Sequence, residues 1–368
     1  MSKNEASEPP AGRVTLLALA PDLGVSRATV SNAYNRPDQL SPALRERIMA
    51  RAAELGFAGP DPMARGLRRG RVGAVGVLVD EGLSYAFSDP TAVLLLDGLA
   101  RELQDDDLGL LLHAGSGDPS SDLEHVRTAA VDAWVVQSLP DGHPAVDAVL
   151  GRGRPVVVLD QPLLPGVPVV GIDDAAGAAV AVRHLTGLGH RRLAVLAMPL
   201  RADRVSGPAD RERQQSATYH VVRERLAGAA AAVAEAGLDW DDVPVVECAT
   251  NEPESARAAL GELLAGPTPP TAVFALSDQL GRGAIRAARA AGVPVPAELS
   301  IVGFDDSPAA AGTTPPLTTV AQPLRERGQA VGALVRALLA GQPAVPPPPA
   351  AVQLVVRGST GPAPETAG

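Results

Sequence analysis

The chain has 368 residues, a formal net charge of −10 at pH 7, six histidines and a single cysteine, Cys248. One cysteine excludes a disulfide framework and a thiolate metal site, and the scattered histidines do not predict a metal centre. The N-terminal stretch lacks the apolar segment of a signal peptide, and no apolar run is long enough to span a membrane. We therefore expect a cytoplasmic protein with no membrane partner.

The charge is divided unevenly along the chain. Residues 1–72 contain 11 basic and 7 acidic side chains, a balance of +4, whereas the remaining residues have a balance of −14. The acidic whole argues against a protein that coats nucleic acid generally. A small basic module on a large acidic body instead indicates DNA binding that is confined to the N-terminal part.

The basic N-terminal part is predicted to contain three short helices. Residues 1–12 are expected to form a disordered tail, and the helices fall within residues 13–59. The first helix starts at Thr15. The second and third begin after the capping residues Ser26 and Ser41, and the third has a proline at its first position.

The second predicted helix, RATVSNAYN, separates polar from apolar side chains. At about 100° per residue, Val30, Ala33 and Tyr34 share one arc, which can dock on a neighbouring helix. The opposite arc is short, polar and free of carboxylates, and this suits close contact with an anionic partner. Taken alone, it is also typical of an ordinary solvated helix. Its members are Arg27, Ala28, Ser31, Asn32 and Asn35.

From Val72 onward, buried strands alternate with amphipathic helices. The strand VGAVGVLVD precedes the helix PTAVLLLDGLARELQ, and the alternation continues as far as LSIVGFD. This pattern predicts parallel, doubly wound sheets, and roughly 100 residues per half indicate two α/β lobes. The stretch PAVPPPPA is expected to form a polyproline-like connector, and residues 359–368 are expected to form a loose tail.

Several of these pieces resemble the LacI/GalR family of transcriptional repressors. The N-terminal pieces are GVSRATVSNAYN, SPALRERIMARAAELGF and MARGLRRGR; those of the body are HLTGLGHRRLAVL, SDQLGRGAIRAARAAGVPVPAELSIVGFDD and PPLTTVAQP. The resemblance spans roughly residues 14–357. It implies a helix-turn-helix DNA-binding domain at 13–59, a hinge at 60–71 and a periplasmic-binding-protein-like effector-binding and dimerisation domain at 72–358. The lobes of that domain would be residues 72–172 plus 323–341, and 173–322 plus 350–358.

The resemblance implies that the second helix reads the major groove of an operator. Arg27, Ala28 and Asn32 would face base edges, where arginine can pair with guanine and asparagine with adenine. Pro21 and Ala18 depart from the family pattern of the first helix, and this predicts that the helix ends early. The remaining expected DNA contacts in this domain, to phosphates and at the starts of the two helices, are Thr15, Ser26, Thr29, Ser31 and Asn35.

The stretch MARGLRR resembles the family's hinge helix, which becomes ordered on operator DNA. Leu67 would insert into a minor-groove step, with Arg65 and Arg68 near phosphates. Gly66 stands where the family tends to have serine and costs about 1 kcal/mol of helix propensity, so the hinge should be more disordered without DNA. A homodimer would bring two hinges to the centre of a near-palindromic, double-stranded operator. A charged flexible linker is the alternative.

The resemblance also implies a small-molecule effector in the cleft between the lobes, beyond the carboxyl ends of the strands. Carboxylates and a guanidinium suit the hydroxyl groups of a sugar-like ligand. Ser277 stands where the family often has asparagine. The residues expected by motif position to point into the cleft are Asp160, Arg225, Asp305 and Gln322. Phe87 and Asp89 are expected to supply effector contacts from the first lobe, and the effector contacts at Ser277 are expected to differ from those of the family.

Two interpretations remain open for each of three features of the body. Arg225 is either a ligand residue or part of an ion pair on a helix surface. Trp134 fits the core better than a platform for sugar stacking. The long segment at 199–220 forms either a lid or a solvated excursion.

Two other classes of function are alternatives to a ligand-responsive repressor. A small-molecule binding protein without a DNA role would need a signal peptide and would not need residues 13–71. An enzyme is disfavoured because the sequence has no phosphate-binding glycine loop and no His/Cys/Ser constellation with usable spacing. No cofactor is predicted. The sequence leaves open the operator, the identity of the effector, induction or co-repression, and dimer or tetramer.

Overall fold

The computed structural model describes residues 16–57, 71–115 and 119–365. The chain divides into two compact units, Met1–Val72 and Gly73–Gly368. The expected tail at 1–12, the helix start at Thr15 and the hinge residues Arg65, Leu67 and Arg68 lie outside the described residues.

The N-terminal unit is a bundle of short helices around a small apolar core. Ser26 and Ser41 cap the second and third helices as predicted, accepting hydrogen bonds from the backbone N–H groups of Thr29 and Leu44. The prediction that the first helix ends early is wrong, because the helix continues through Pro21 to Asp22. The core consists of Leu19, Ala20, Val30, Ala33, Ile48 and Ala52. The elements are α1 (Leu16–Asp22), α2 (Arg27–Asn35), η1 (Pro37–Gln39) and α3 (Pro42–Glu54).

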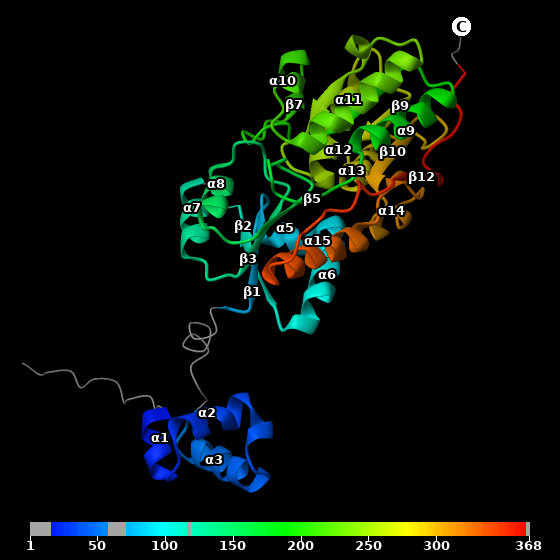
Figure 1. The fold of residues 1–368 in the computed structure, drawn as a ribbon. Helices are drawn as coiled ribbons and strands as arrows, with labels where there is room; N and C mark the ends of the chain where they lie inside the picture. The colour runs from blue at the N-terminus through cyan, green and yellow to red at the C-terminus, as the bar shows by residue number, and fades with distance from the viewer. Residues whose placement is uncertain (1–15, 58–70, 116–118, 366–368) are drawn as a thin grey trace, which may run out of the picture. The chain divides into compact units, whose positions relative to one another are not determined.

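The body contains two lobes, each a doubly wound α/β sandwich, as the alternation predicted (Figure 1). The first lobe has a parallel sheet in the order β2-β1-β3-β4-β5, with α6 and α15 against one face and α7 and α8 against the other. Its strands are β1 (Ala74–Val79), β2 (Gly109–Ala114), β3 (Ala133–Gln137), β4 (Val156–Leu159) and β5 (Val169–Val170). Its helices are α5 (Leu83–Ser88), α6 (Pro90–Leu103), η2 (Gln104–Asp106), α7 (Pro119–Thr128), α8 (Pro144–Gly151) and α15 (Leu324–Leu339).

The second lobe has a seven-stranded sheet in the order β12-β11-β10-β9-β6-β8-β7, parallel except for its two edge strands. Helices α9 and α11 cover one face, and α12 and α13 cover the other. The strands are β6 (Leu193–Ala197), β7 (Gly207–Pro208), β8 (Val245–Glu247), β9 (Ala272–Ala275), β10 (Ser300–Asp305), β11 (Thr318–Ala321) and β12 (Gln353–Val355). The helices are α9 (Asp174–Gly187), α10 (Arg211–Gln215), α11 (His220–Glu235), η3 (Trp240–Asp242), α12 (Pro253–Ala265), α13 (Asp278–Ala290) and α14 (Pro308–Ala311).

The chain passes between the lobes three times, at residues 171–173, 322–323 and 340–352. The third crossing carries the proline-rich stretch and touches the first through a hydrogen bond from the Ala350 N–H to the Gly171 carbonyl, 3.0 Å. Trp134 is fully buried in the first lobe and therefore belongs to the core. In the part of the chain that the structure describes, no helix combines the length and apolar character needed to cross a bilayer.

Neighbouring helices in both lobes meet at glycines. A Cβ atom on Gly228 of α11 would lie 2.0 Å from the Ala175 carbonyl oxygen of α9. Equivalent contacts of 2.1 Å would arise at Gly98, where α6 meets α15, and at Gly283, where α13 meets α12. These backbones approach so closely that no side chain fits between them.

We predict that Gly228→Ala lowers the free energy of unfolding by about 1–3 kcal/mol, because the added methyl group forces two packed helices apart. Urea unfolding of the full chain measures the change. Gly261→Ala is the matched control, since Gly261 lies inside α12 with nothing within 4 Å of an added Cβ. That control should be neutral or stabilising by about 0.5–1 kcal/mol. Equal effects of the two substitutions would contradict the close-contact explanation.

The expectation of a loose tail from residue 359 is wrong. Ser359 is fully buried; its hydroxyl donates to the Ile301 carbonyl, 2.6 Å, and accepts from the Thr318 N–H, 2.8 Å. Further on, the Ala363 N–H donates to the Leu188 carbonyl, 2.9 Å. The segment therefore satisfies backbone groups of the second lobe, a role that its composition does not reveal.

A buried histidine lies beneath this C-terminal segment. The imidazole of His190 contacts the hydroxyls of Thr271 and Ser300, both at 3.0 Å, and the Gly361 carbonyl, 3.1 Å. Burial lowers the pKa of His190 below its ordinary value. The neighbouring His184 also has a lowered pKa, because burial disfavours its charged form as well.

We predict that His190→Gln weakens the acid sensitivity of the fold. As the pH falls through the ordinary histidine range, the unfolded chain binds a proton that the buried His190 resists, so stability is lost. Unfolding free energies measured at pH 7.5 and at pH 5.5 should therefore differ more in the wild type than in the variant. Identical differences would show that His190 does not carry this dependence.

Candidate functional site

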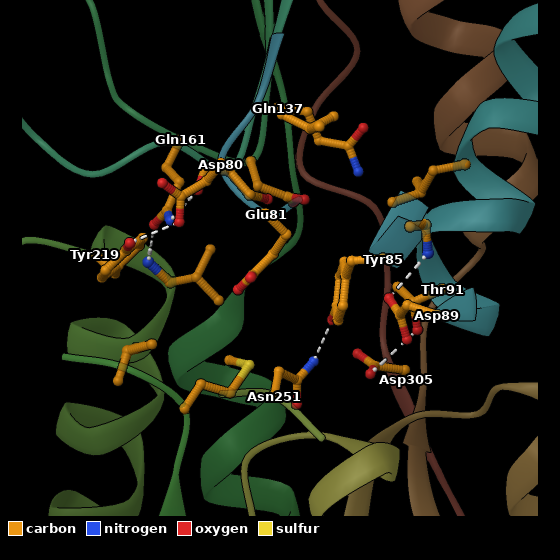
Figure 2. A pocket seen from close by; sticks show the side chains of 18 of the residues that line it. Asp80, Glu81, Tyr85, Asp89, Thr91, Gln137, Gln161, Tyr219, Asn251 and Asp305 are labelled. Atoms are coloured by element: carbon orange, nitrogen blue, oxygen red, sulfur yellow. Dashed lines mark hydrogen bonds between the residues drawn. The ribbon is translucent and has the colours of Figure 1, made fainter. Parts of the chain in front are cut away.

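A cavity of about 150 Å³ lies between the two lobes of the body (Figure 2). It opens at the carboxyl ends of parallel strands, where β1 leads into Asp80 and Glu81 and β4 leads into Asp160. From the second lobe, β10 ends at Asp305, and Gln322 follows β11. Both lobes thus contribute polar side chains to one cavity.

The backbone is strained at three of the lining residues. Ser138, Asp160 and Asp305 have φ values of 57°, 69° and 119°, in the region that favours glycine. Such conformations cost about 1–3 kcal/mol each and persist where the surrounding structure fixes them, typically at functional sites. The strain therefore makes this edge of the sheets a candidate functional site.

A buried arginine connects the lining carboxylates. Arg327 of α15 is 3% exposed and donates hydrogen bonds to Asp160 and to the side-chain oxygen of Gln322. The Gln322 amide in turn donates to Asp305 Oδ1, 2.7 Å. This network joins the two lobes at the second crossing.

The second arginine in the cavity wall is also paired. Arg225 Nε donates to Asp174 Oδ1, 2.8 Å, and its guanidinium carbon lies 3.7 Å from the centre of the Phe304 ring. Its Nη1 lies 3.9 Å from Asp305 Oδ1. Burial raises the pKa of Asp305 well above its ordinary range, although the positive charge of Arg225 opposes that rise.

The first lobe offers acceptors on the other side of the cavity. Asp89 caps α6 through a hydrogen bond of 3.1 Å from the Ala92 N–H to Oδ2, while its buried Oδ1 has no hydrogen-bond partner among the described residues. Burial raises the pKa of Asp89. Figure 2 shows Asp89 beside Thr91, whose hydroxyl donates to Asp305, 3.3 Å.

Helix α2 of the N-terminal unit presents the polar arc that its sequence predicts. Val30 and Ala33 are buried, whereas Arg27 and Ala28 are exposed. The Asn32 amide contacts Gln39 Oε1, 3.4 Å. The side chain of Asn35 lies outside the described structure.

Comparison with known proteins assigns the chain to a family. A model for the periplasmic-binding-protein-like domain matches residues 182–360. Over 332 residues the chain is 44% identical to the HTH-type transcriptional regulator Rv3575c of Mycobacterium tuberculosis, covering 89% of this chain and 92% of that protein. A solved LacI-family regulator from Corynebacterium glutamicum is similar with a TM-score of 0.73 and 34% identity, covering 94% of this chain and 98% of that one.

The chain belongs to the LacI family of transcriptional regulators. The complex of the transcriptional regulator CelR with cellobiose is also similar, with a TM-score of 0.68 and 30% identity over 94% of this chain and 100% of that one. Membership of the LacI family makes the protein a DNA-binding transcriptional regulator and not an enzyme.

The structure of this LacI-family member brings together most of the residues expected in the cleft. Asp89, Asp160, Arg225, Asp305 and Gln322 all line the cavity. Arg225 forms an ion pair as well as lining the cavity, so its two interpretations do not exclude each other. That these five residues bind an effector stays a prediction.

Phe87 and Ser277, also expected to contact the effector, do not line this cavity, and their contact with an effector stays a prediction. The side chain of Phe87 is 68% exposed, because the short helix α5 turns it outward while Tyr85 of the same helix lines the cavity. Ser277 caps α13, and its hydroxyl donates to Asn251 Oδ1, 2.5 Å. Asn251 lines the cavity in its place and donates to the Tyr85 hydroxyl, 2.7 Å.

Sequence reasoning missed several polar residues of the cavity wall. Asp80 and Glu81 directly follow the first strand, so the rule that selected Asp160 at a strand end could have found them. Arg327 and Asn251 carry no such signal, since one lies within a helix and the other in a loop.

Proposed function

We propose that this LacI-family regulator represses transcription from a near-palindromic operator, and that a small, uncharged, sugar-like ligand in the interlobe cavity changes its affinity for that operator. The observation that carries the proposal is the cavity itself: a space at the carboxyl ends of the strands, lined from both lobes by carboxylates.

The charges of the wall favour an uncharged ligand. Five residues that line the cavity are acidic. The two arginines that line it are already paired with carboxylates. A phosphate or carboxylate on the ligand would therefore meet acceptors rather than a free cation. Carboxylates that accept hydrogen bonds from hydroxyl groups suit a polyol, and the unpartnered Oδ1 of Asp89 is one such acceptor.

The size of the cavity favours a ligand with one ring. Its volume of about 150 Å³ is well below the roughly 300–1,000 Å³ of sites for drug-sized ligands. CelR forms a complex with cellobiose, a disaccharide, and supports a sugar-like ligand in this fold. We propose a single-ring polyol for this chain, since the cavity into which these carboxylates point has a volume of only about 150 Å³.

The N-terminal unit supports DNA reading by α2. The exposed guanidinium of Arg27 has the reach to pair with the major-groove edge of guanine. One such unit reads a half-site, so we propose that a homodimer reads the full operator.

Ligand and operator would be coupled through the arrangement of the lobes. A ligand changes operator affinity only if it binds two arrangements of the lobes with different affinity, and the operator then changes ligand affinity by the same factor. The expected coupling is about 1–3 kcal/mol, or roughly 5- to 150-fold.

We predict that Arg27→Ala weakens preference for one base pair in each half-site by about 1–3 kcal/mol, because a bidentate contact to that base is lost. Selection of bound sequences from an operator library measures the preference at each position. Arg36→Ala is the control, because Arg36 lies just after α2 and outside the polar arc. Unchanged selectivity in Arg27→Ala would rule out Arg27 as a base reader.

We predict that Asp305→Ala abolishes ligand binding while operator binding in the absence of ligand stays near normal. Thermal unfolding with matched pairs of uncharged and phosphorylated hexoses and cyclic polyols first identifies a ligand for the wild type. An uncharged compound should raise stability, by about 2.7 kcal/mol at 100 times its Kd. Binding of the phosphorylated compounds alone would contradict the charge argument.

Asp306→Ala is the matched control for this variant. Asp306 follows Asp305 directly but pairs with Arg357, 2.5 Å, and does not line the cavity. It should keep ligand binding. A response to the ligand in Asp305→Ala would show that the cavity is not the binding site, and a loss of operator binding would show that Asp305 is structural.

A further inference from the structure

The long segment between β6 and α11 reaches from the second lobe to the first. It is anchored at its base, where β7 pairs with β8 and Arg213 pairs with Glu247, 2.7 Å. A solvated excursion would lack such contacts. The segment is therefore an ordered part of the second lobe, fixed in a position from which it contacts the first lobe.

The contact with the first lobe is made by Arg204. Its Nη2 lies 2.6 Å from Asp80 Oδ2, and its Nη1 lies 2.8 Å from Glu81 Oε1. The Tyr219 hydroxyl, also from the second lobe, donates to the same oxygen of Asp80, 2.6 Å. Figure 2 shows Tyr219 aimed at Asp80, with Glu81 beside it. One guanidinium and one phenol thus bind two adjacent carboxylates across the lobes.

These ion pairs are shielded from water more than ordinary surface pairs. The side chain of Arg204 is 27% exposed, that of Asp80 14% and that of Glu81 27%. Burial raises the pKa of Glu81, and the positive charge of Arg204 opposes that rise. Without Arg204, two neighbouring carboxylates would face each other with Tyr219 as their remaining donor from the second lobe.

The backbone of Arg204 is held in a costly conformation. Its φ of 48° lies in the left-handed region that favours glycine. Such a conformation persists where the surrounding structure fixes it.

Arg204 also stands at a boundary between two spaces. Asp80, Glu81 and Tyr219 line the inner cavity of about 150 Å³, and the same three residues together with Arg204 line a second cavity of about 600 Å³. The ion pairs therefore form part of the wall between the two cavities.

We propose that Arg204 is a latch between the lobes: its ion pairs with Asp80 and Glu81 hold the closed arrangement in the absence of ligand. As a positioning residue, it fixes two carboxylates of the cavity wall and keeps the closed state populated. A ligand that binds only this state has an apparent Kd equal to its intrinsic Kd divided by the closed fraction. This consequence rests on the proposed function, whereas the latch itself is tested without a ligand.

Energy transfer between two dyes in the full-length chain measures lobe closure directly. The dyes are attached to Leu150→Cys on α8 of the first lobe and Glu262→Cys on α12 of the second lobe, both exposed positions. Cys248 is 1% exposed and stays unlabelled. An excess of unlabelled chain ensures that transfer is measured within one copy.

Arg204→Gln should shift the distance distribution toward longer interlobe distances, while the wild type stays closed. Raising the salt concentration from about 0.05 M to about 1 M should move the wild type toward the variant, because ions screen the partly exposed pairs. Arg211→Gln is the matched control: Arg211 lies in the same segment but pairs with Asp241 inside the second lobe, 2.5 Å. It should leave the distribution unchanged.

Glu81→Gln provides a second variant from the opposite lobe. It should open the lobes in the same direction, and adding it to Arg204→Gln should open them by less than the sum of the single effects, since both break one contact. Urea unfolding of each variant confirms that its fold is intact. A distance distribution in folded Arg204→Gln and Glu81→Gln that equals the wild type would overturn the latch. It would leave the proposals on ligand and operator standing, because neither is present in the experiment.

Once a ligand is known, Arg204→Gln should raise its Kd. A fall in the closed fraction from about 0.9 to about 0.1 corresponds to a roughly ninefold increase. Arg211→Gln should leave the Kd unchanged. An unchanged Kd in an Arg204→Gln variant with open lobes would show that the ligand binds both arrangements equally. That result would contradict the proposal that the ligand binds only the closed arrangement.

Discussion

The architecture of the cleft depends on the buried guanidinium of Arg327. It binds Asp160 at the end of β4 and Gln322 in the second crossing, and through Gln322 it is connected to Asp305 of the second lobe. A buried charge is tolerated only when it is paired, and removal of one partner costs about 3–5 kcal/mol. The pairing therefore fixes the positions of the side chains that face the cavity before any ligand arrives.

The parallel topology explains why these side chains meet. In each lobe the carboxyl ends of the central strands lie along one edge of the sheet, and the two edges face each other across the cavity. Left-handed backbone at Ser138, Asp160 and Asp305 then turns the chain sharply at that edge. The fold thus places these residues at the cavity, and the positive φ values set the direction of the chain at that edge.

Much of this could be read from the sequence because the signals are local. Serine caps and alternating apolar runs marked the helices and strands, and Asp160 and Asp305 stand out as carboxylates that end apolar runs. The differences arose where long-range packing decides. Ser359 looks like part of a polar tail until its hydrogen bonds with β10 and β11 are seen, and nothing near Phe87 in the sequence shows that α5 turns it to the solvent. Arg327 lies in the first turn of α15, directly after the second crossing. Its place in the cleft depends on the path of the chain between the lobes, and the local sequence does not show that path.

The glycine contacts between helices have a mechanical consequence for the body. Helices that touch backbone to backbone cannot slide past each other without collision, so we expect each lobe to move as a unit. Any rearrangement then falls on the three crossings. The first and third crossings are joined by the hydrogen bond between Ala350 and Gly171. The third contains four consecutive prolines, Pro346–Pro349, which restrict its backbone to an extended, stiff conformation. We therefore expect the lobes to rotate relative to each other about the side where the three crossings lie.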